Sequence, residues 1–258
     1  MYVAIVDTET TGVAESDEAI SAGILLLEIE TPTGRLIRSA GHYLGYREPQ
    51  KAIHPAAARV HGLSREQLSG RAFDVYEMER LIEAADVLVA HNAKFDARML
   101  LPHVPMIVEK KWRCSWQQFP WPDGLPNKKL DTVCAHFDLE RGNPHNALLD
   151  CGALGDCLLV QSGETEQGGT YFGKLLSSGD YGPFLEVNAP RTRAKPSNDE
   201  SSQFYNPAWP DFARLDEENW ADAAHRYERE RTDERWVRLG TVCAVSAIAL
   251  VAAILSFH

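Results

Sequence analysis

The sequence of 258 residues has few cysteines, and their arrangement excludes two kinds of site. The five cysteines are odd in number and scattered, and no pair has the C-x-x-C spacing. A disulfide framework needs paired cysteines, and a cysteine zinc site needs closely spaced thiolates. We therefore expect neither, and we expect a reducing, cytosolic environment. The first residues also lack a basic stretch followed by an apolar one, so we expect no signal peptide.

Basic residues are outnumbered by acidic ones. Lys and Arg total 26, Asp and Glu total 37, and the net charge is −11. This balance argues against a broad basic surface that grips duplex DNA along its length. It remains compatible with nucleic acid that enters end-on, where bound metal ions neutralise carboxylates. The hydrophobic share of 44% is ordinary for a globular protein, and no internal repeat is present.

Composition divides the chain into four segments. Residues 1–160 alternate strand-like and helix-like patterns, and 161–212 form a linker or irregular region rich in proline and polar residues. Residues 213–238 read as a charged helical stalk, and 239–257 are apolar. We expect strands over 2–6, 20–29, 36–44 and 87–90, and helices at 64–67, 73–84, 95–101, 130–137 and 147–160. Three strands followed by alternating helices and strands predict an α/β fold with a mixed sheet flanked by helices.

The apolar segment 239–257 contains 19 residues and no charge. About 20 residues of α-helix span a bilayer core. Four arginines precede the segment, and positive residues favour the cytoplasmic side of a membrane. We expect a single-pass, C-terminal transmembrane helix with the rest of the chain on the cytoplasmic face. The alternative is a hydrophobic helix buried within a complex.

Carboxylates gather at points where α/β proteins place their sites. Asp7 and Glu9 are separated by one residue at the end of the first strand, so both side chains point to one face. Neighbouring carboxylates repel unless a cation lies between them, and hard oxygen ligands suit Mg²⁺ or Mn²⁺. Asp96 follows a buried strand at a helix start, and Asp150 lies in an apolar helix. Each carboxylate taken alone also fits a solvated strand end or helix start.

His145 lies five residues before Asp150, in the turn that precedes its helix. An imidazole with an ordinary pKa near 6.5 suits a general base at neutral pH. Taken alone, His145 also fits an ordinary surface histidine.

In this order, the segments resemble the DnaQ-like family of 3′→5′ exonucleases, in the subgroup called DEDDh. The motifs are V-D-T-E-T-T-G at 6–12, A-H-N-A-K-F-D at 90–96 and H-N-A-L-L-D at 145–150, with R-V-H-G-L-S at 59–64 between the first two. Residues 1–160 are most similar to the proofreading (epsilon) subunits of bacterial DNA polymerase III and their free-standing relatives. Two departures are I-S-A-G at 20–23, where relatives often have an acidic residue, and W-R-C-S at 112–115.

The resemblance implies a ribonuclease H-like mixed sheet and hydrolysis of the terminal phosphodiester, releasing nucleoside monophosphates. Two Mg²⁺ or Mn²⁺ ions would be bound by the four acidic residues Asp7, Glu9, Asp96 and Asp150. His145 would act as the general base. Contacts to the terminal nucleotide are expected from Thr10, His61 and Asn92.

We expect the substrate to be a single-stranded or frayed 3′ end, and DNA rather than RNA. The alternatives are an RNA-trimming exoribonuclease and an inactive nucleic-acid-binding scaffold at the membrane. No segment identifies a polymerase or repair partner. The stretch 111–127 is rich in Trp and Pro, and it either stacks bases or caps the core with aromatic side chains.

Overall fold

A computed structural model describes residues 1–118, 121–141, 144–163 and 169–182. The chain divides into two compact units, 1–194 and 195–258, and all described residues belong to the first. The predicted stalk at 213–238 and the apolar segment at 239–257 lie outside the described residues. Within the described part, no helix is both long and apolar enough to cross a membrane.

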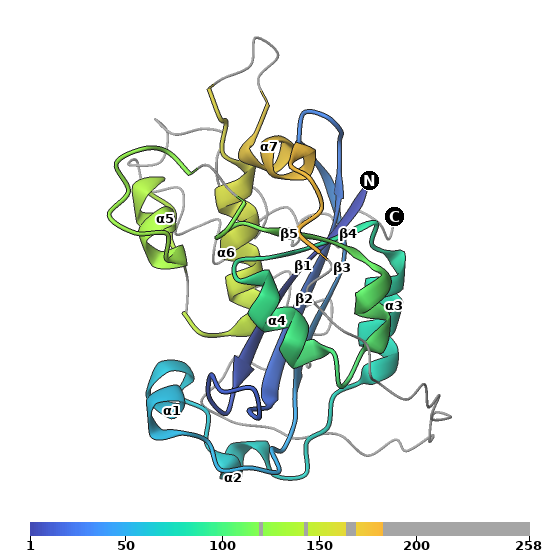
Figure 1. Cartoon of the computed structure of the whole chain (residues 1–258), viewed down its shortest axis with the longest axis vertical. Helices are drawn as coiled ribbons and strands as arrows, with labels where there is room; N and C mark the ends of the chain where they lie inside the picture. The colour runs from blue at the N-terminus through green and yellow to red at the C-terminus, as the bar shows by residue number, and fades with distance from the viewer. Residues whose placement is uncertain (119–120, 142–143, 164–168, 183–258) are drawn as a thin grey trace, which may run out of the picture. The chain divides into compact units, whose positions relative to one another are not determined.

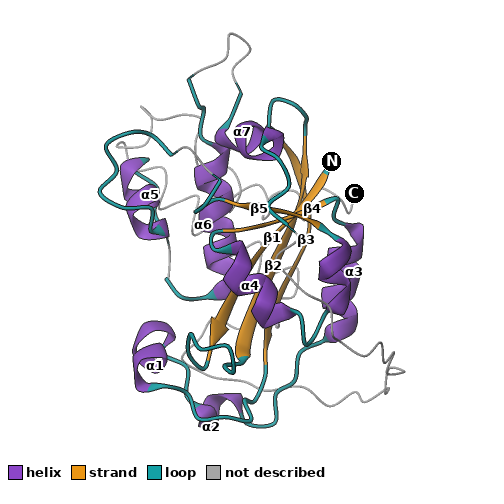
Figure 2. Ribbon diagram, in the orientation of Figure 1, coloured by secondary structure: helices purple, strands orange, loops and turns teal. Residues whose placement is uncertain are grey.

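The centre of the fold is a five-stranded sheet in the order β3-β2-β1-β4-β5. Its strands are β1 (Tyr2–Thr10), β2 (Ala19–Ile29), β3 (Leu36–Tyr46), β4 (Val87–Ala90) and β5 (Lys111–Cys114). The first three strands are antiparallel neighbours, whereas β4 runs parallel to β1 and to β5. Figure 2 shows the strands side by side with helices around them. The expected mixed sheet with flanking helices is confirmed.

Helices cover both faces of the sheet, which explains the continuous apolar runs of its central strands. The helices are α1 (Pro55–His61), α2 (Arg65–Leu68), α3 (Val75–Ala84), α4 (Ala93–Leu100), α5 (Leu130–His136), α6 (Ala147–Leu159) and α7 (Tyr171–Ser177), with a 3-10 turn at Pro105–Glu109. Side chains of α3 and α4 share one core cluster with Ala4 and Val6 of β1. Helix α6 packs on β1 and β2 from the other side, and Figure 1 shows α3 and α6 flanking the strands.

Three elements differ from the sequence-based expectation. Helix α1 and strand β5 were not predicted, and α7 lies in the stretch 161–212 expected to be irregular. Helix α7 has only seven residues, too few for a clear apolar period, and the Thr170 side chain caps its first turn. Strand β5 has four residues and is defined by pairing with β4, which the local sequence does not reveal.

The tryptophans at 112 and 121 belong to the core. Trp112 in β5 is buried, and its indole N–H donates to the carbonyl of Ile107 at 3.0 Å. Trp121 is also buried, beside the rings of Phe137 and Tyr171. The base-stacking interpretation of this stretch is therefore wrong for these two side chains, and the core-capping one is confirmed for them.

Candidate active site

Strand β1 places Asp7 and Glu9 on one face of the sheet, as the spacing predicts. In the register of β1 with β2, Asp7 lies opposite Gly23 and Glu9 opposite Ser21. Asp7 is half-buried and Glu9 is buried. The register shifts directly after Glu9, so the regular ladder is interrupted at the two carboxylates. Both carboxylates thus project beside helix α6 at the end of β1.

Asp96 lies near the same end of β1 and comes from α4, on the other face of the sheet. It lies in the first turn of α4, which begins just after β4, and it is buried. The intervening residue of the D-T-E segment, Thr8, donates its hydroxyl hydrogen to Asp96 Oδ1 at 2.8 Å. Since alternate residues of a strand point to opposite faces, Thr8 connects β1 to α4 while Asp7 and Glu9 face α6. Sequence analysis did not assign Thr8 a role, although its place between two acidic residues was the available signal.

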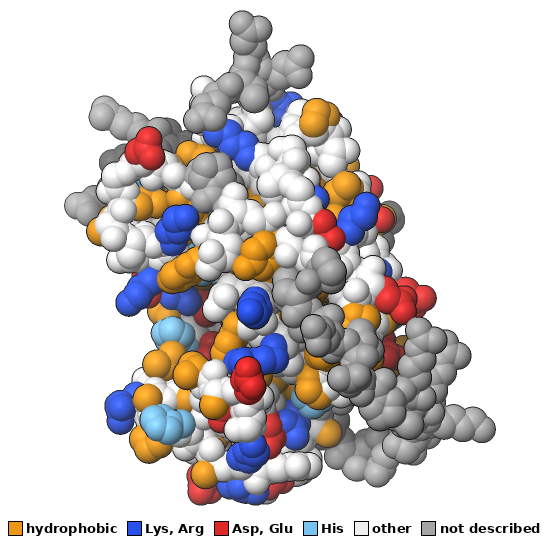
Figure 3. Space-filling model, in the orientation of Figure 1, with side chains coloured by type: hydrophobic (Ala, Val, Ile, Leu, Met, Phe, Trp, Pro, Cys, Tyr) orange, Lys and Arg blue, Asp and Glu red, His pale blue; other side chains and the backbone are white. Residues whose placement is uncertain are grey.

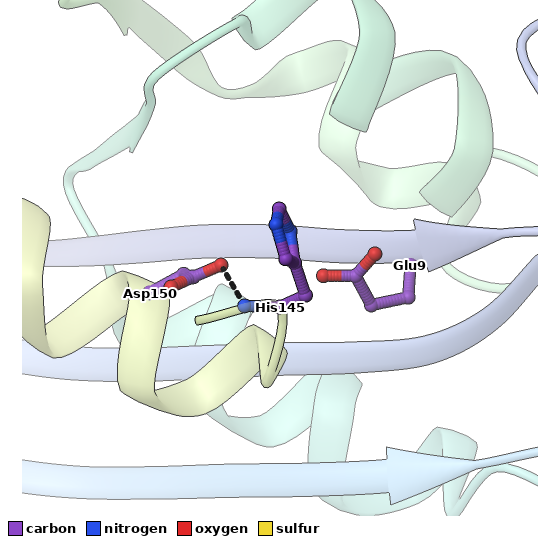
Figure 4. A group of neighbouring side chains, drawn as sticks. All are labelled: Glu9, His145 and Asp150. Atoms are coloured by element: carbon purple, nitrogen blue, oxygen red, sulfur yellow. Dashed lines mark hydrogen bonds between the residues drawn. The ribbon is translucent and has the colours of Figure 1, made fainter. Parts of the chain in front are cut away.

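His145 and Asp150 are fixed by the start of α6. The Asn146 side chain caps this helix by accepting a hydrogen bond from the backbone N–H of Leu149 at 3.2 Å. His145 has a positive φ of 65°, and its backbone N–H donates to Asp150 Oδ2 at 3.1 Å. Figure 4 shows the imidazole between the carboxyl groups of Asp150 and Glu9. One ligand atom from each of the three residues lies within 4.8 Å of the others.

Gly23 lets the backbone of α6 lie directly against β2. A Cβ at Gly23 would stand 2.4 Å from the Ala147 carbonyl carbon, far inside contact distance. Because Gly23 is opposite Asp7, this approach sets the distance between the two halves of the site. The sequence shows a glycine here but not the backbone that it accommodates.

Alanine at Gly23 is expected to push the start of α6 away from β1. We expect a loss of about 1–3 kcal/mol in stability from overpacking, and a fall in the rate of catalysis on the order of hundredfold from displaced ligands. Thermal melting and initial rates on a labelled oligonucleotide measure both. Gly179→Ala is the matched control, since a methyl group there meets no atom within 4 Å. Equal behaviour of the two variants would contradict this role for Gly23.

The carboxylates of the site repel one another. Burial, and then the charges of Asp150 and Asp96, together raise the pKa of Glu9 to about 8, against a lowering by Arg141. Burial also raises the pKa of Asp96 to about 7, against the hydrogen bond from Thr8. The pKa of Asp7 is raised well above its ordinary value by burial and then by Asp96, Glu9 and Asp150. Buried oxygen donors that resist ionising without a cation fit a divalent metal such as Mg²⁺ or Mn²⁺.

These pKa shifts predict how metal-free stability depends on pH. The folded pKa values of Glu9 and Asp96 lie above the ordinary 4.5 and 3.8, so folding favours their protonated forms. Their contribution is complete below those ordinary values and is lost as pH rises through about 7 to 8. In EDTA we expect the melting temperature to fall as pH rises from about 4.5 to about 8, and we expect Mn²⁺ to raise it more at pH 8.5 than at low pH. Calorimetry of the parent and of Glu9→Gln checks this; a pH-independent melting temperature in the parent would contradict it.

The three expected nucleotide contacts lie in different environments. The Nδ1 atom of His61 accepts from the backbone N–H of Leu63 at 3.0 Å, so Nε2 carries the proton and donates to the Thr10 carbonyl at 3.2 Å. The Thr10 hydroxyl donates to the Gly12 carbonyl at 2.6 Å. His61 and Thr10 are buried and hold this turn in place, whereas Asn92 is exposed at the start of α4 without a side-chain capping bond. Contact of these residues with a nucleotide stays a prediction.

Arg141 is a member of the site that sequence analysis missed. Its guanidinium pairs with both carboxylate oxygens of Asp150, and it also bonds Asp131 of α5. Nothing in the residues around Arg141 marks it in the sequence, because its partners Asp131 and Asp150 lie on two different helices.

The face of the molecule drawn in Figure 3 carries Lys and Arg among acidic, hydrophobic and uncharged side chains, without one continuous basic block.

Comparison with known proteins places the site in a family. The family model described as "Exonuclease" matches residues 4–157. The chain is 27% identical over 167 residues to the PolC-type DNA polymerase III of Oceanobacillus iheyensis, a match that covers 61% of this chain and 11% of that protein. It is 30% identical over 179 residues to the DNA polymerase III subunit epsilon of Escherichia coli, covering 62% of this chain and 70% of that one. A solved structure of exonuclease X in complex with 5′ overhanging duplex DNA is 22% identical, with a TM-score of 0.46, and the match covers 66% of this chain and 99% of that one.

The chain thus spans about a tenth of the length of the PolC-type relative and about two thirds of the epsilon subunit. The family match covers more than half of the chain and contains all four carboxylates of the site and His145. The chain therefore belongs to the exonuclease family, and its described part carries the exonuclease domain.

Proposed function

We propose that this exonuclease domain removes nucleoside monophosphates one at a time from the 3′ end of nucleic acid, with two Mg²⁺ or Mn²⁺ ions. The observation that carries the proposal is that mutually repelling carboxylates and His145 come together at the carboxyl-terminal end of strand β1. Asp7, Glu9 and Asp150 would hold one ion, with Asp7 shared with a second ion and Asp96 completing its site. Divalent cations at this position supply Lewis acidity and lower the pKa of the attacking water.

The residues of the chain have separate tasks in this mechanism. Thr8 fixes the orientation of Asp96 through its hydroxyl. His145 accepts the proton of the attacking water, and its position between Glu9 and Asp150 keeps the imidazole beside the metal ligands. Thr10, His61 and Asn92 are proposed to contact the terminal nucleotide. The acidic balance of the chain supports a short end of single strand as substrate, because a long duplex is bound mainly through basic residues.

We propose DNA rather than RNA as the preferred substrate. The support is the likeness to two relatives that are named as DNA polymerase III proteins. The test incubates the full-length chain with equal amounts of a DNA and an RNA oligonucleotide of the same sequence, each with a different 5′ label. We expect the DNA to shorten first. Faster shortening of RNA would assign the chain to RNA trimming, and binding without shortening of either strand would favour the inactive scaffold.

We also propose that segment 239–257 anchors the chain in a membrane, with the exonuclease domain on the cytoplasmic side. The support is its 19 uncharged residues and the arginines before it. After expression in cells, the full-length chain should stay in the membrane fraction at alkaline pH, and a chain lacking 236–258 should not. Release of both at alkaline pH would contradict the anchor.

A further inference from the structure

Arg141 holds a carboxylate that the proposed metal needs. Its Nε donates to Asp150 Oδ1 at 3.0 Å and its Nη2 donates to Asp150 Oδ2 at 2.8 Å. Both side chains are nearly excluded from solvent, with 12% of the Arg141 side chain and 4% of the Asp150 side chain exposed. These two parallel hydrogen bonds, called the fork below, form the bidentate geometry in which an arginine and a carboxylate interact most strongly. A pair so well shielded from water differs from a surface salt bridge, which contributes little.

The pairing uses most of the acceptor capacity of Asp150. A carboxylate offers about four lone-pair positions. Arg141 engages one on each oxygen, and the backbone N–H of His145 takes another on Oδ2 at 3.1 Å. A divalent cation bound to Asp150 and Glu9 would have to use the remaining position beside a full positive charge, or displace the guanidinium from one oxygen.

A second contact keeps Arg141 in this position. Its Nη1 pairs with Asp131 of α5, so the guanidinium bridges α5 and α6. Asp131 is mostly exposed, and it pairs with Nη1, the guanidinium nitrogen that Asp150 does not use. The two contacts can therefore be separated by mutation: Asp131 anchors the arginine, and Asp150 is the group for which arginine and metal compete.

We propose that Arg141 is the counter-cation of Asp150 in the metal-free protein, and that it competes with the divalent cation and so raises the metal concentration at which the site fills. This inference rests on the proposed function, because it requires Asp150 to be a metal ligand. It makes Arg141 a positioning residue. The opposite possibility is that Arg141 orients Asp150 for the metal, in which case its removal would weaken metal binding.

The test measures Mn²⁺ binding to the full-length chain at pH 7.5 by loss of the electron paramagnetic resonance signal of free Mn²⁺. Arg141→Gln removes the charge and the fork, and we expect it to bind Mn²⁺ about tenfold more tightly than the parent, since a like charge a few ångströms from the ion is removed. Arg141→Lys keeps the charge without the fork and should fall between the two. Asp131→Asn is the matched control: it loosens the tie to α5 but keeps the fork on Asp150, so it should tighten Mn²⁺ binding far less than Arg141→Gln does.

Thermal melting gives a second readout that does not depend on activity. In EDTA, Arg141→Gln leaves Asp150 buried and unpaired, so its melting temperature should fall below that of the parent. Saturating Mn²⁺ should then raise it by more than it raises the parent. Unchanged or weaker Mn²⁺ binding by Arg141→Gln and Arg141→Lys would overturn the inference while leaving the proposed function in place. Absence of Mn²⁺ binding by the parent, or equal binding by Asp150→Asn, would instead overturn the metal site itself.

Discussion

Alanine in place of Asp7 is expected to slow hydrolysis by about a thousandfold or more while the protein stays folded. The charges of the other three acidic residues, Asp96, Glu9 and Asp150, all raise the pKa of Asp7. Without Asp7, neither proposed metal position keeps its full set of oxygen ligands. Losing groups that stabilise the charge of the transition state lowers the rate by about two to three orders of magnitude or more. Initial rates on a 5′-labelled oligonucleotide in Mn²⁺ measure the loss.

The same substitution should make the metal-free protein more stable, although it slows hydrolysis. Removing one of several mutually repelling carboxylates relieves the metal-free site, so Asp7→Ala should melt at a higher temperature than the parent in EDTA at pH 8. The additional stabilisation by Mn²⁺ should be lost. Glu83→Ala is the matched control, because Glu83 is an exposed carboxylate on α3 with the same charge. An Asp7→Ala protein that keeps parental activity would contradict the proposed metal site.

Asparagine in place of His145 is expected to lower the rate by about a thousandfold, within the range for loss of a general base. Asparagine is the suitable substitution because His145 has a φ of 65°, which asparagine adopts more readily than most residues. The backbone N–H to Asp150 is also retained. The variant therefore removes the imidazole and leaves the turn before α6 in place.

The His145→Asn variant also separates two roles for the imidazole. A ring nitrogen of His145 lies within 4.8 Å of carboxylate oxygens of Glu9 and Asp150, so the imidazole can act as a base or as a metal ligand. If it is the base, Mn²⁺ affinity should stay near that of the parent while the turnover rate falls. If it is a ligand, the affinity should fall with the rate. The first result agrees with the proposed mechanism, and the second contradicts it.

The sequence predicts the local geometry of the site well where one element carries it. Asp7 and Glu9 share a face because strands have a period of two, and Asp150 lies in the first turn of an apolar helix as expected. The mixed sheet and both of its covering layers also follow from the order of strand and helix patterns. These predictions hold because each depends on periodicity within one segment.

Features that depend on two distant segments were not predictable. The Arg141 side chain pairs with carboxylates of two helices, α5 and α6, and Gly23 matters because the backbone of Ala147 approaches it. Thr8 acquires its role only when α4 brings Asp96 within 2.8 Å. Strand β5 is likewise defined by its partner strand. Each is a tertiary contact, and no local pattern encodes it.

Metal-dependent removal of nucleotides from the 3′ end is tested by following the products of a 5′-labelled single-stranded oligonucleotide incubated with the full-length chain. In Mn²⁺ or Mg²⁺ we expect a ladder that shortens from the 3′ end by one nucleotide at a time, with nucleoside monophosphate as the released product. EDTA and Asp7→Ala should each abolish the ladder. Shortening that persists in EDTA, internal fragments, or release of the labelled 5′ nucleotide first would contradict a metal-dependent 3′→5′ exonuclease at this site.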